Sequence, residues 1–177
     1  MEILFQSNRV TAPELSIVLL DWSCRESFHI FDYLSSQAVD RSKFEILWVE
    51  YYERREKEIE AAIRKSQLAG EHPPVDKWII LDMPRNLYYH KHLMYNVGII
   101  ASARRIVTFC DSDGIVTKNF VNSIIESFEQ DRNIVLHMDQ VRNSEKKYYP
   151  FNYPSLEEVT TLGKNNVVDG NLRVYGT

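Results

Sequence analysis

The strongest constraint on how this sequence folds is a regular alternation of short apolar runs with longer amphipathic segments. Continuous apolar runs that lack helical spacing and are too short for buried helices are typical of strands covered on both faces. Runs of this kind occupy residues 15–20, 44–49, 77–81, 105–110 and 133–138. Each run predicts a buried strand in a mostly parallel sheet.

The segments between these runs carry apolar residues at helical spacing. They comprise residues 28–38, 53–69, 89–103 and 118–130. In the third of these segments, we expect Leu93, Val97 and Ile100 to face inward. Strands that alternate with helices predict the α/β class, here an open, mostly parallel, doubly wound sheet with helices on both faces.

The length and composition are those of an ordinary folded domain. The chain has 177 residues, of which 44% are hydrophobic and 26% charged, so it can bury a single core. We expect residues 1–14 to be an N-terminal extension and residues 15–142 to form the α/β domain. Residues 143–177 differ in character, because an aromatic, proline-bearing stretch is followed there by a part rich in Asn and Gly.

The charge and the cysteines exclude several classes of protein. The net charge is −4 and basic residues are scattered among acidic ones, which argues against nucleic acid as a partner. No apolar run approaches the roughly 20 residues that span a bilayer, and residues 1–7 lack the basic flank of a signal peptide. With Cys24 and Cys110 as the only cysteines, we expect reduced thiols and a cytoplasmic location.

An acidic triplet, Asp111-Ser112-Asp113, follows directly after the fourth strand-like run. Open parallel sheets bind their ligands at the carboxyl ends of the strands. Two carboxylates separated by one residue can converge there on a hard cation such as Mg²⁺ or Mn²⁺, which completes its shell with water and substrate phosphates. The same pattern is compatible with acids that cap the next helix or stay solvated.

The loops after the other strands supply side chains that suit a nucleotide. Trp22, after the first run, can stack on a nucleobase, and Glu50, after the second, can accept a hydrogen bond from a base imide. A Trp that packs at an edge and a solvated Glu are the alternatives. Four basic side chains precede or open the third helical segment and suit either a pyrophosphate or a simple polar helix start: Arg85, His90, Lys91 and His92.

In their order along the chain, these residues resemble the motifs of the family 2 glycosyltransferases, which are inverting enzymes of the GT-A type. Residues 20–23, Leu-Asp-Trp-Ser, stand where the family usually has Pro-Thr-Tyr-Asn, and Glu50 stands where its Asp-Asp-Gly-Ser begins. Residues 94–99, Met-Tyr-Asn-Val-Gly-Ile, are similar to Ala-Arg-Asn-x-Gly-Ile, and the acidic triplet follows at the family's spacing. The resemblance covers residues 15–138.

The resemblance implies a Rossmann-like fold of the nucleotide-diphospho-sugar transferases and inverting transfer from a donor, most simply a UDP-sugar. It implies that Trp22 stacks on the base, that Glu50 recognises the base as uracil, and that Asn96 faces the cleft. The implied nucleotide-binding residues are Asp21, Trp22, Glu50, Lys91, Asn96 and Asp111. The implied metal ligands are Asp111 and Asp113, for an Mn²⁺ or Mg²⁺ ion that neutralises charge on the departing nucleoside diphosphate.

The catalytic residue and the acceptor, a saccharide or glycan, are not identified by the sequence. Inverting transfer needs a general base, which the family carries well after its metal motif. No residue matches it here, and Asp169 fits a turn better. We therefore expect the donor-binding part of a transferase, with residues 143–177 beginning an incomplete acceptor-side region.

Two other functions stay open. One is a nucleotide-sugar-binding or interaction domain without turnover, which shares every donor-side residue and lacks only the base. The other is a phosphohydrolase of the haloacid-dehalogenase type, because residues 111–116 resemble the motif Asp-x-Asp-Gly-Thr-Val of that family. An incomplete sheet would also expose an edge strand, which favours homo-oligomers.

Overall fold

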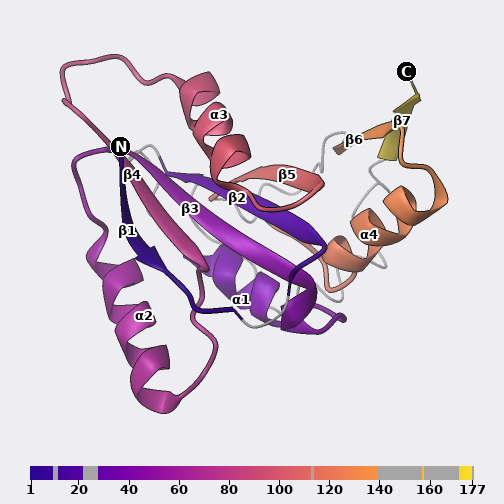
Figure 1. The fold of residues 1–177 in the computed structure, drawn as a ribbon, viewed down its shortest axis with the longest axis horizontal. Helices are drawn as coiled ribbons and strands as arrows, with labels where there is room; N and C mark the ends of the chain where they lie inside the picture. Colours follow the sequence, from indigo (N-terminus) through magenta and orange to yellow (C-terminus); the bar gives the residue numbers. More distant parts are fainter. Residues whose placement is uncertain (10–11, 22–27, 113, 139–156, 158–171, 177) are drawn as a thin grey trace. The chain divides into compact units, whose positions relative to one another are not determined.

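The computed structural model describes residues 1–9, 12–21, 28–112, 114–138, 157 and 172–176 of the chain. Its main feature is a five-stranded sheet with the strand order β1-β4-β3-β2-β5 (Figure 1). The strands are β1 (Glu2–Gln6), β2 (Leu15–Asp21), β3 (Phe44–Tyr52), β4 (Lys77–Met83) and β5 (Ile106–Asp111). Strands β2 to β5 are parallel and β1 is antiparallel to β4, so the predicted open, mostly parallel α/β sheet is confirmed.

The central strands are buried along nearly their whole length. Every residue of β2 is buried, and so is every residue of β3 except Tyr52. In the sheet, Val18 lies between Leu47 on β3 and Phe109 on β5. Cover on both faces explains why these runs are continuously apolar and do not alternate with polar residues.

Helix α3 (Lys91–Ala101) covers one face of the sheet (Figure 1). Met94 and Val97 of this helix are buried in one cluster with apolar side chains of β2, β3 and β4. Gly98 makes the closest approach, because a Cβ at this position would lie 2.4 Å from Cγ1 of Val18. The close packing of α3 on β2 explains why the Asn-x-Gly-Ile pattern has a glycine at this position.

The outward face of α3 corrects one sequence prediction. Val97 is buried and Leu93 is partly buried, but Ile100 is 80% exposed. The buried stripe of the helix runs through Met94, Val97 and Gly98, and Ile100 lies to one side of it. The prediction for Ile100 was therefore wrong, because apolar spacing alone did not fix the rotation of the helix about its axis.

We expect Gly98→Ala to lower the free energy of unfolding by about 1–3 kcal/mol, the usual cost of overpacking a core. Val18 is fully buried and β-branched, so it has no room to yield to an added methyl group. Chemical denaturation measures the change, and Ile100→Ala on the same helix is the exposed control. Equal losses in the two variants would show that the contact at Gly98 is not tight.

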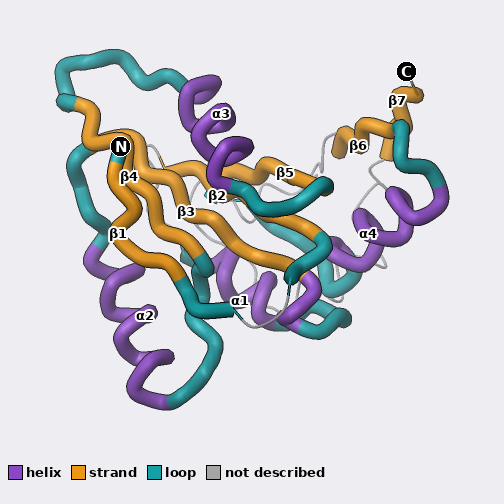
Figure 2. Tube along the Cα trace, in the orientation of Figure 1, coloured by secondary structure: helices purple, strands orange, loops and turns teal. Residues whose placement is uncertain are grey.

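The opposite face of the sheet is covered by α2 (Lys57–Ala69) and by the residues that begin α1 (His29–Ser35). On α2, Ile59 and Ile63 are buried. The ring of Trp48, on β3, lies with its centroid 5.7 Å from that of Phe28 and 5.4 Å from that of Phe31. Figure 2 shows these helices and strands by type, and both faces carry helices as the doubly wound arrangement requires.

Strand β1 belongs to the segment that the sequence suggested as an N-terminal extension. It pairs with β4, and the register shifts between Ile3 and Phe5, where a bulge interrupts the ladder. A bulge also interrupts the alternation of inward and outward side chains, so residues 2–6 show no clear strand pattern. The first residues of the chain are therefore part of the sheet.

The chain forms two compact units, of which the first comprises Met1–Phe31 and Asp40–Gly114 and contains the sheet. In the second unit, α4 (Phe120–Gln130) buries three apolar side chains, and β6 (Ile134–Met138) pairs antiparallel with β7 (Leu172–Gly176). Segment 133–138 thus contains a strand as predicted, but the strand pairs with β7 and does not join the parallel sheet. Apolar periodicity identifies a strand without choosing its partner. Among the described residues, no helix has the length and apolar character needed to cross a membrane.

Candidate functional site

Three acidic residues mark the edge at which the parallel strands end. Asp21 is the last residue of β2, Glu50 lies near the end of β3, and Asp111 is the last residue of β5. The sheet register pairs Asp21 with Glu50 and Leu20 with Asp111. Three of the residues that the sequence singled out therefore stand on adjacent strands, at the edge where open α/β sheets bind ligands.

Asp111 forms an ion pair with Lys91, the first residue of α3. The Nζ atom of Lys91 lies 2.7 Å from Oδ1 and 3.0 Å from Oδ2 of Asp111, and 5.6 Å from the ring centroid of Tyr95. Burial alone would lower the pKa of Lys91, but its hydrogen bonds to Asp111 and Tyr95 outweigh burial and raise this pKa. Lys91, at the start of α3, therefore stays protonated beside Asp111, the last residue of β5.

Both members of this ion pair can be reached from solvent. The side-chain exposure is 37% for Lys91 and 48% for Asp111. A half-exposed carboxylate supplies the hard oxygen ligands that Mg²⁺ and Mn²⁺ prefer, and an ammonium group supplies a partner for phosphate oxygens. The pair therefore offers a binding point to a cation and to an anion at one place.

The backbone after Asp111 closes in a tight turn. The Gly114 N–H donates to the carbonyl oxygen of Asp111 at 2.9 Å, and His29 Nε2 lies 3.0 Å from the carbonyl oxygen of Gly114. A Cβ at Gly114 would lie 2.5 Å from Sγ of Cys110, so a larger residue does not fit there. The turn fixes the backbone that carries the Asp111 carboxylate.

Glu50 is turned into the protein and not toward solvent. Its side chain is buried, and its Oε1 atom accepts hydrogen bonds from the indole N–H of Trp78 at 2.9 Å and of Trp48 at 3.3 Å. Oε1 also accepts from the Glu56 N–H, and Oε2 accepts from the Arg55 N–H, each at 3.0 Å. With four N–H donors around it, the carboxylate fastens the turn between β3 and α2 to the sheet.

The electrostatics of Glu50 agree with this position. Burial raises the pKa of Glu50, and the negative charge of Asp21 adds to the rise, while the Glu56 N–H and the two indoles oppose it. The carboxylate of Glu50 is therefore held by donors that the fold itself supplies. Recognition of a base by Glu50, which the resemblance implies, stays a prediction.

Tyrosines hold the segment that leads into α3, a feature that the sequence did not suggest. The hydroxyl of Tyr51 donates to the carbonyl oxygen of Tyr88 at 3.0 Å, and that of Tyr52 donates to Leu87 at 3.1 Å. Burial raises the pKa of Tyr89 to about 12, in the combined field of Lys91, Asp111 and Asp21. The ring of Tyr89 also meets that of Tyr51 edge to face, with centroids 5.5 Å apart, so Tyr89 belongs to the aromatic group before α3. The aromatic run before the basic helix start was the available signal.

The other predicted site residues have different outcomes. Asn96 is exposed on α3, as are His92 on the same helix and Arg85 and His90 before it. Trp22, Asp113 and Cys24 lie outside the described residues. Within the ranges that the structure describes, no three His, Cys, Asp or Glu side chains gather into a group that could hold a metal ion.

Comparison with known proteins finds similar folds among solved structures. No family model and no curated protein matches the sequence. Among solved structures, S. aureus TarS 1–349 is similar with a TM-score of 0.55 and 12% identity, over 80% of this chain and 38% of that one. The same protein in complex with UDP-GlcNAc gives a TM-score of 0.55 over 37% of its length. The mannosyltransferase PcManGT from Pyrobaculum calidifontis, in complex with GDP-Man and Mn²⁺, gives 0.50 at 14% identity, over 77% of this chain and 39% of that one.

The chain spans less than two fifths of the length of these structures. The similar structures are glycosyltransferases, and at this level of identity they establish that the chain has a glycosyltransferase-like α/β fold.

Proposed function

We propose that this chain binds the nucleoside diphosphate part of an activated sugar, as the donor-binding part of an inverting glycosyltransferase of the family 2 type. The observation that carries the proposal is the solvent-reachable Lys91–Asp111 ion pair at the carboxyl edge of the sheet. Lys91 offers a positive partner to the diphosphate, and Asp111 offers an oxygen ligand to a divalent cation. The structural similarity to glycosyltransferases supports this choice of ligand.

We assign a divalent cation, Mn²⁺ or Mg²⁺, to Asp111 and Asp113. The donor set fits such an ion, because it consists of hard carboxylate oxygens and Asp111 is half exposed. Asp113 lies outside the described residues, so its part rests on the acidic triplet. When bound, the ion would neutralise charge on the diphosphate. The complex of PcManGT with GDP-Man and Mn²⁺ supports this pairing of ligands.

We assign stacking on the base to Trp22, with a UDP-sugar as the donor. Asp21, which ends β2 and is 4% exposed, is assigned to the nucleotide side of the site from within the protein. Glu50 stands beside Asp21, but its carboxylate already accepts hydrogen bonds from four N–H groups of the chain. Its part is therefore indirect, as the residue that holds the turn after β3 next to the base. Asn96, exposed on α3, is assigned to the phosphate side.

The reaction that we propose for the whole protein is inverting transfer of the sugar to a saccharide or glycan acceptor. A domain that binds the donor without turnover is the alternative, since it needs every donor-side residue but no general base. Incubation with a radiolabelled UDP-sugar and saccharide acceptors separates the two. Transfer above background supports the enzyme, and donor binding without transfer supports the binding domain.

Binding of Mn²⁺ in the presence of UDP tests the assigned metal site. The electron paramagnetic resonance signal of free Mn²⁺ should fall when protein and UDP are both present. Asp111→Asn should weaken this binding roughly tenfold or more, because it removes one charged ligand. Asp82→Asn is the matched control, since Asp82 is an exposed acid near the end of β4, which β3 and β2 separate from β5 in the sheet. Equal Mn²⁺ binding by the Asp111→Asn variant and the unmodified chain would contradict the assignment.

A further inference from the structure

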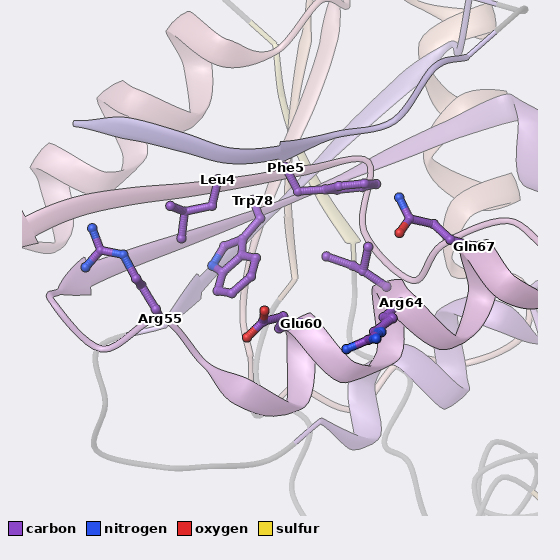
Figure 3. Close-up of a pocket in the computed structure, with 8 residues that line it drawn as sticks. Leu4, Phe5, Arg55, Glu60, Arg64, Gln67 and Trp78 are labelled. Atoms are coloured by element: carbon purple, nitrogen blue, oxygen red, sulfur yellow. The ribbon is translucent and has the colours of Figure 1, made fainter.

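An open pocket of about 480 Å³ lies between strands β1 and β4 and helix α2, apart from the edge that carries Asp111 (Figure 3). The volume is within the range of small-ligand sites in proteins. Leu4, Phe5 and Trp78 form an apolar lining, and polar side chains of α2 and Arg55 surround it. The pocket therefore combines an aromatic and aliphatic floor with a polar rim.

The bulge in β1 contributes to this pocket. Consecutive residues of a regular strand point to opposite faces of a sheet. The register shift between Ile3 and Phe5 makes Leu4 an extra residue, and both Leu4 and Phe5 line the pocket. Since bulges commonly redirect side chains at sheet edges, this one widens the apolar floor beside Trp78.

The polar rim is made by one stripe of α2, through Glu60, Arg64 and Gln67. Figure 3 shows these side chains around the mouth of the pocket. Glu60 and Arg64 are one helical turn apart, yet their side chains make no ion pair or hydrogen bond with each other. In the described part of the chain, the side chains of Glu60, Arg64 and Gln67 also make no such contact with any other residue. On the rim, the carboxylate of Glu60 can accept hydrogen bonds, the guanidinium of Arg64 can donate them, and the amide of Gln67 can do both. All three groups are available to a ligand.

The groups around the pocket carry no net positive charge. The guanidinium of Arg55 lies 3.1 Å from a carboxylate oxygen of Glu2 and 3.3 Å from one of Asp82, so two negative charges face its one positive charge. On the rim, the negative charge of Glu60 balances the positive charge of Arg64. An anion therefore gains little from this pocket, because two positive and three negative groups surround it.

We infer that this pocket binds a neutral saccharide. A sugar ring has an apolar C–H face that suits the half-buried Leu4 and Phe5, with the buried Trp78 behind them. Its hydroxyl groups both donate and accept hydrogen bonds, as Glu60, Arg64 and Gln67 require. An alkyl chain would cover the same floor but would make no hydrogen bond with the polar rim, so it would gain less than a saccharide. The inference does not depend on the proposed donor site, which lies at another edge of the sheet.

Saturation-transfer NMR with the whole chain tests the inference. The probes are methyl β-glucopyranoside, a trisaccharide of N-acetylglucosamine and a trisaccharide of mannose, with decanoate as an apolar anion. At least one saccharide should receive saturation and shift the indole N–H resonance of Trp78. UDP with Mg²⁺, which does not broaden the resonances, should not displace the saccharide. A failed donor site and a failed saccharide site therefore give different results.

Variants of the rim locate the binding. Glu60→Ala and Arg64→Ala should each weaken saccharide binding about tenfold, as expected for one lost hydrogen bond to a charged group. Both side chains are exposed, so the variants should fold, and Lys65→Ala on another side of α2 is the matched control. Three results would each overturn the inference: no saccharide binds, only decanoate binds, or the rim variants bind as the unmodified chain does.

Discussion

Replacing Lys91 with Ala is expected to weaken the binding of UDP in the presence of Mn²⁺ by roughly 10–100-fold, the value of one hydrogen bond to a charged group. Lys91 opens α3, and hydrogen bonds to Asp111 and Tyr95 keep its ammonium charged. In the proposed site, the same ammonium is a positive partner for the diphosphate beside the divalent cation. Calorimetric titration with UDP and Mn²⁺ measures the loss.

Two controls separate this effect from a loss of folding. Lys57→Ala removes a Lys at the start of α2, the position that Lys91 has in α3, and should leave binding unchanged. Lys91→Arg keeps the charge and should restore part of the affinity. The melting temperature of the Lys91→Ala variant should change little, because ion pairs with exposed members contribute little to stability. Equal affinities of Lys91→Ala and Lys57→Ala for UDP would contradict the role of Lys91.

Replacing Glu50 with Ala is expected to lower the free energy of unfolding by about 3–5 kcal/mol, the usual cost of removing one partner from a buried charged network. The change leaves the indole N–H groups of Trp48 and Trp78 and the backbone N–H groups of Arg55 and Glu56 without their acceptor. Since a domain is stable by only about 5–15 kcal/mol, this variant should unfold at a much lower denaturant concentration.

Glu50→Gln should cost less, about 1–3 kcal/mol, because one amide oxygen still accepts hydrogen bonds while the amide nitrogen meets the remaining donors. Glu53→Ala, an exposed Glu in the same turn, is the control and should change stability little. If Glu50 instead recognises a base from an exposed position, Glu50→Ala should weaken UDP binding without this loss of stability. That result would contradict the role that we assign to Glu50.

The stability conferred by Glu50 also depends on pH in a defined direction. Burial raises the pKa of Glu50, so the folded chain keeps this proton to a higher pH than the unfolded chain does. The contribution is fully present below the ordinary value of 4.5 and is lost as the pH rises through the folded pKa. The stability of the unmodified chain relative to Glu50→Gln should therefore fall across this window.

The sequence predicted the parallel strands and most of the helices because burial on both faces leaves a strong pattern. The runs at residues 15–20 and 44–49 lie in strands that are buried almost throughout. The sequence did not predict which strands pair. Strand β6 pairs with β7, more than thirty residues later in the chain, and the bulge in β1 interrupts the pattern by which a strand is identified. Local periodicity reports the faces of a segment and not the segment beside which it lies.

The candidate site was predictable in its position and less so in its contacts. Asp21, Glu50 and Asp111 stand at one edge, as the order of strands and helices indicates. The direction of Glu50 could have been inferred, since it is two residues after Trp48 and therefore shares its face of β3. The pairing of Lys91 with Asp111 depends on how α3 sits on the sheet, which spacing in the sequence does not give.

Calorimetric titration of the unmodified chain with UDP, with and without Mn²⁺, tests the central claim most directly. The claim predicts one binding site for UDP per chain, bound more tightly when Mn²⁺ is present, and weakened by Lys91→Ala and by Asp111→Asn. No binding of UDP under either condition would contradict it. Binding that neither Mn²⁺ nor the two substitutions change would also contradict it, because the nucleotide would then lie away from the edge where Lys91 meets Asp111.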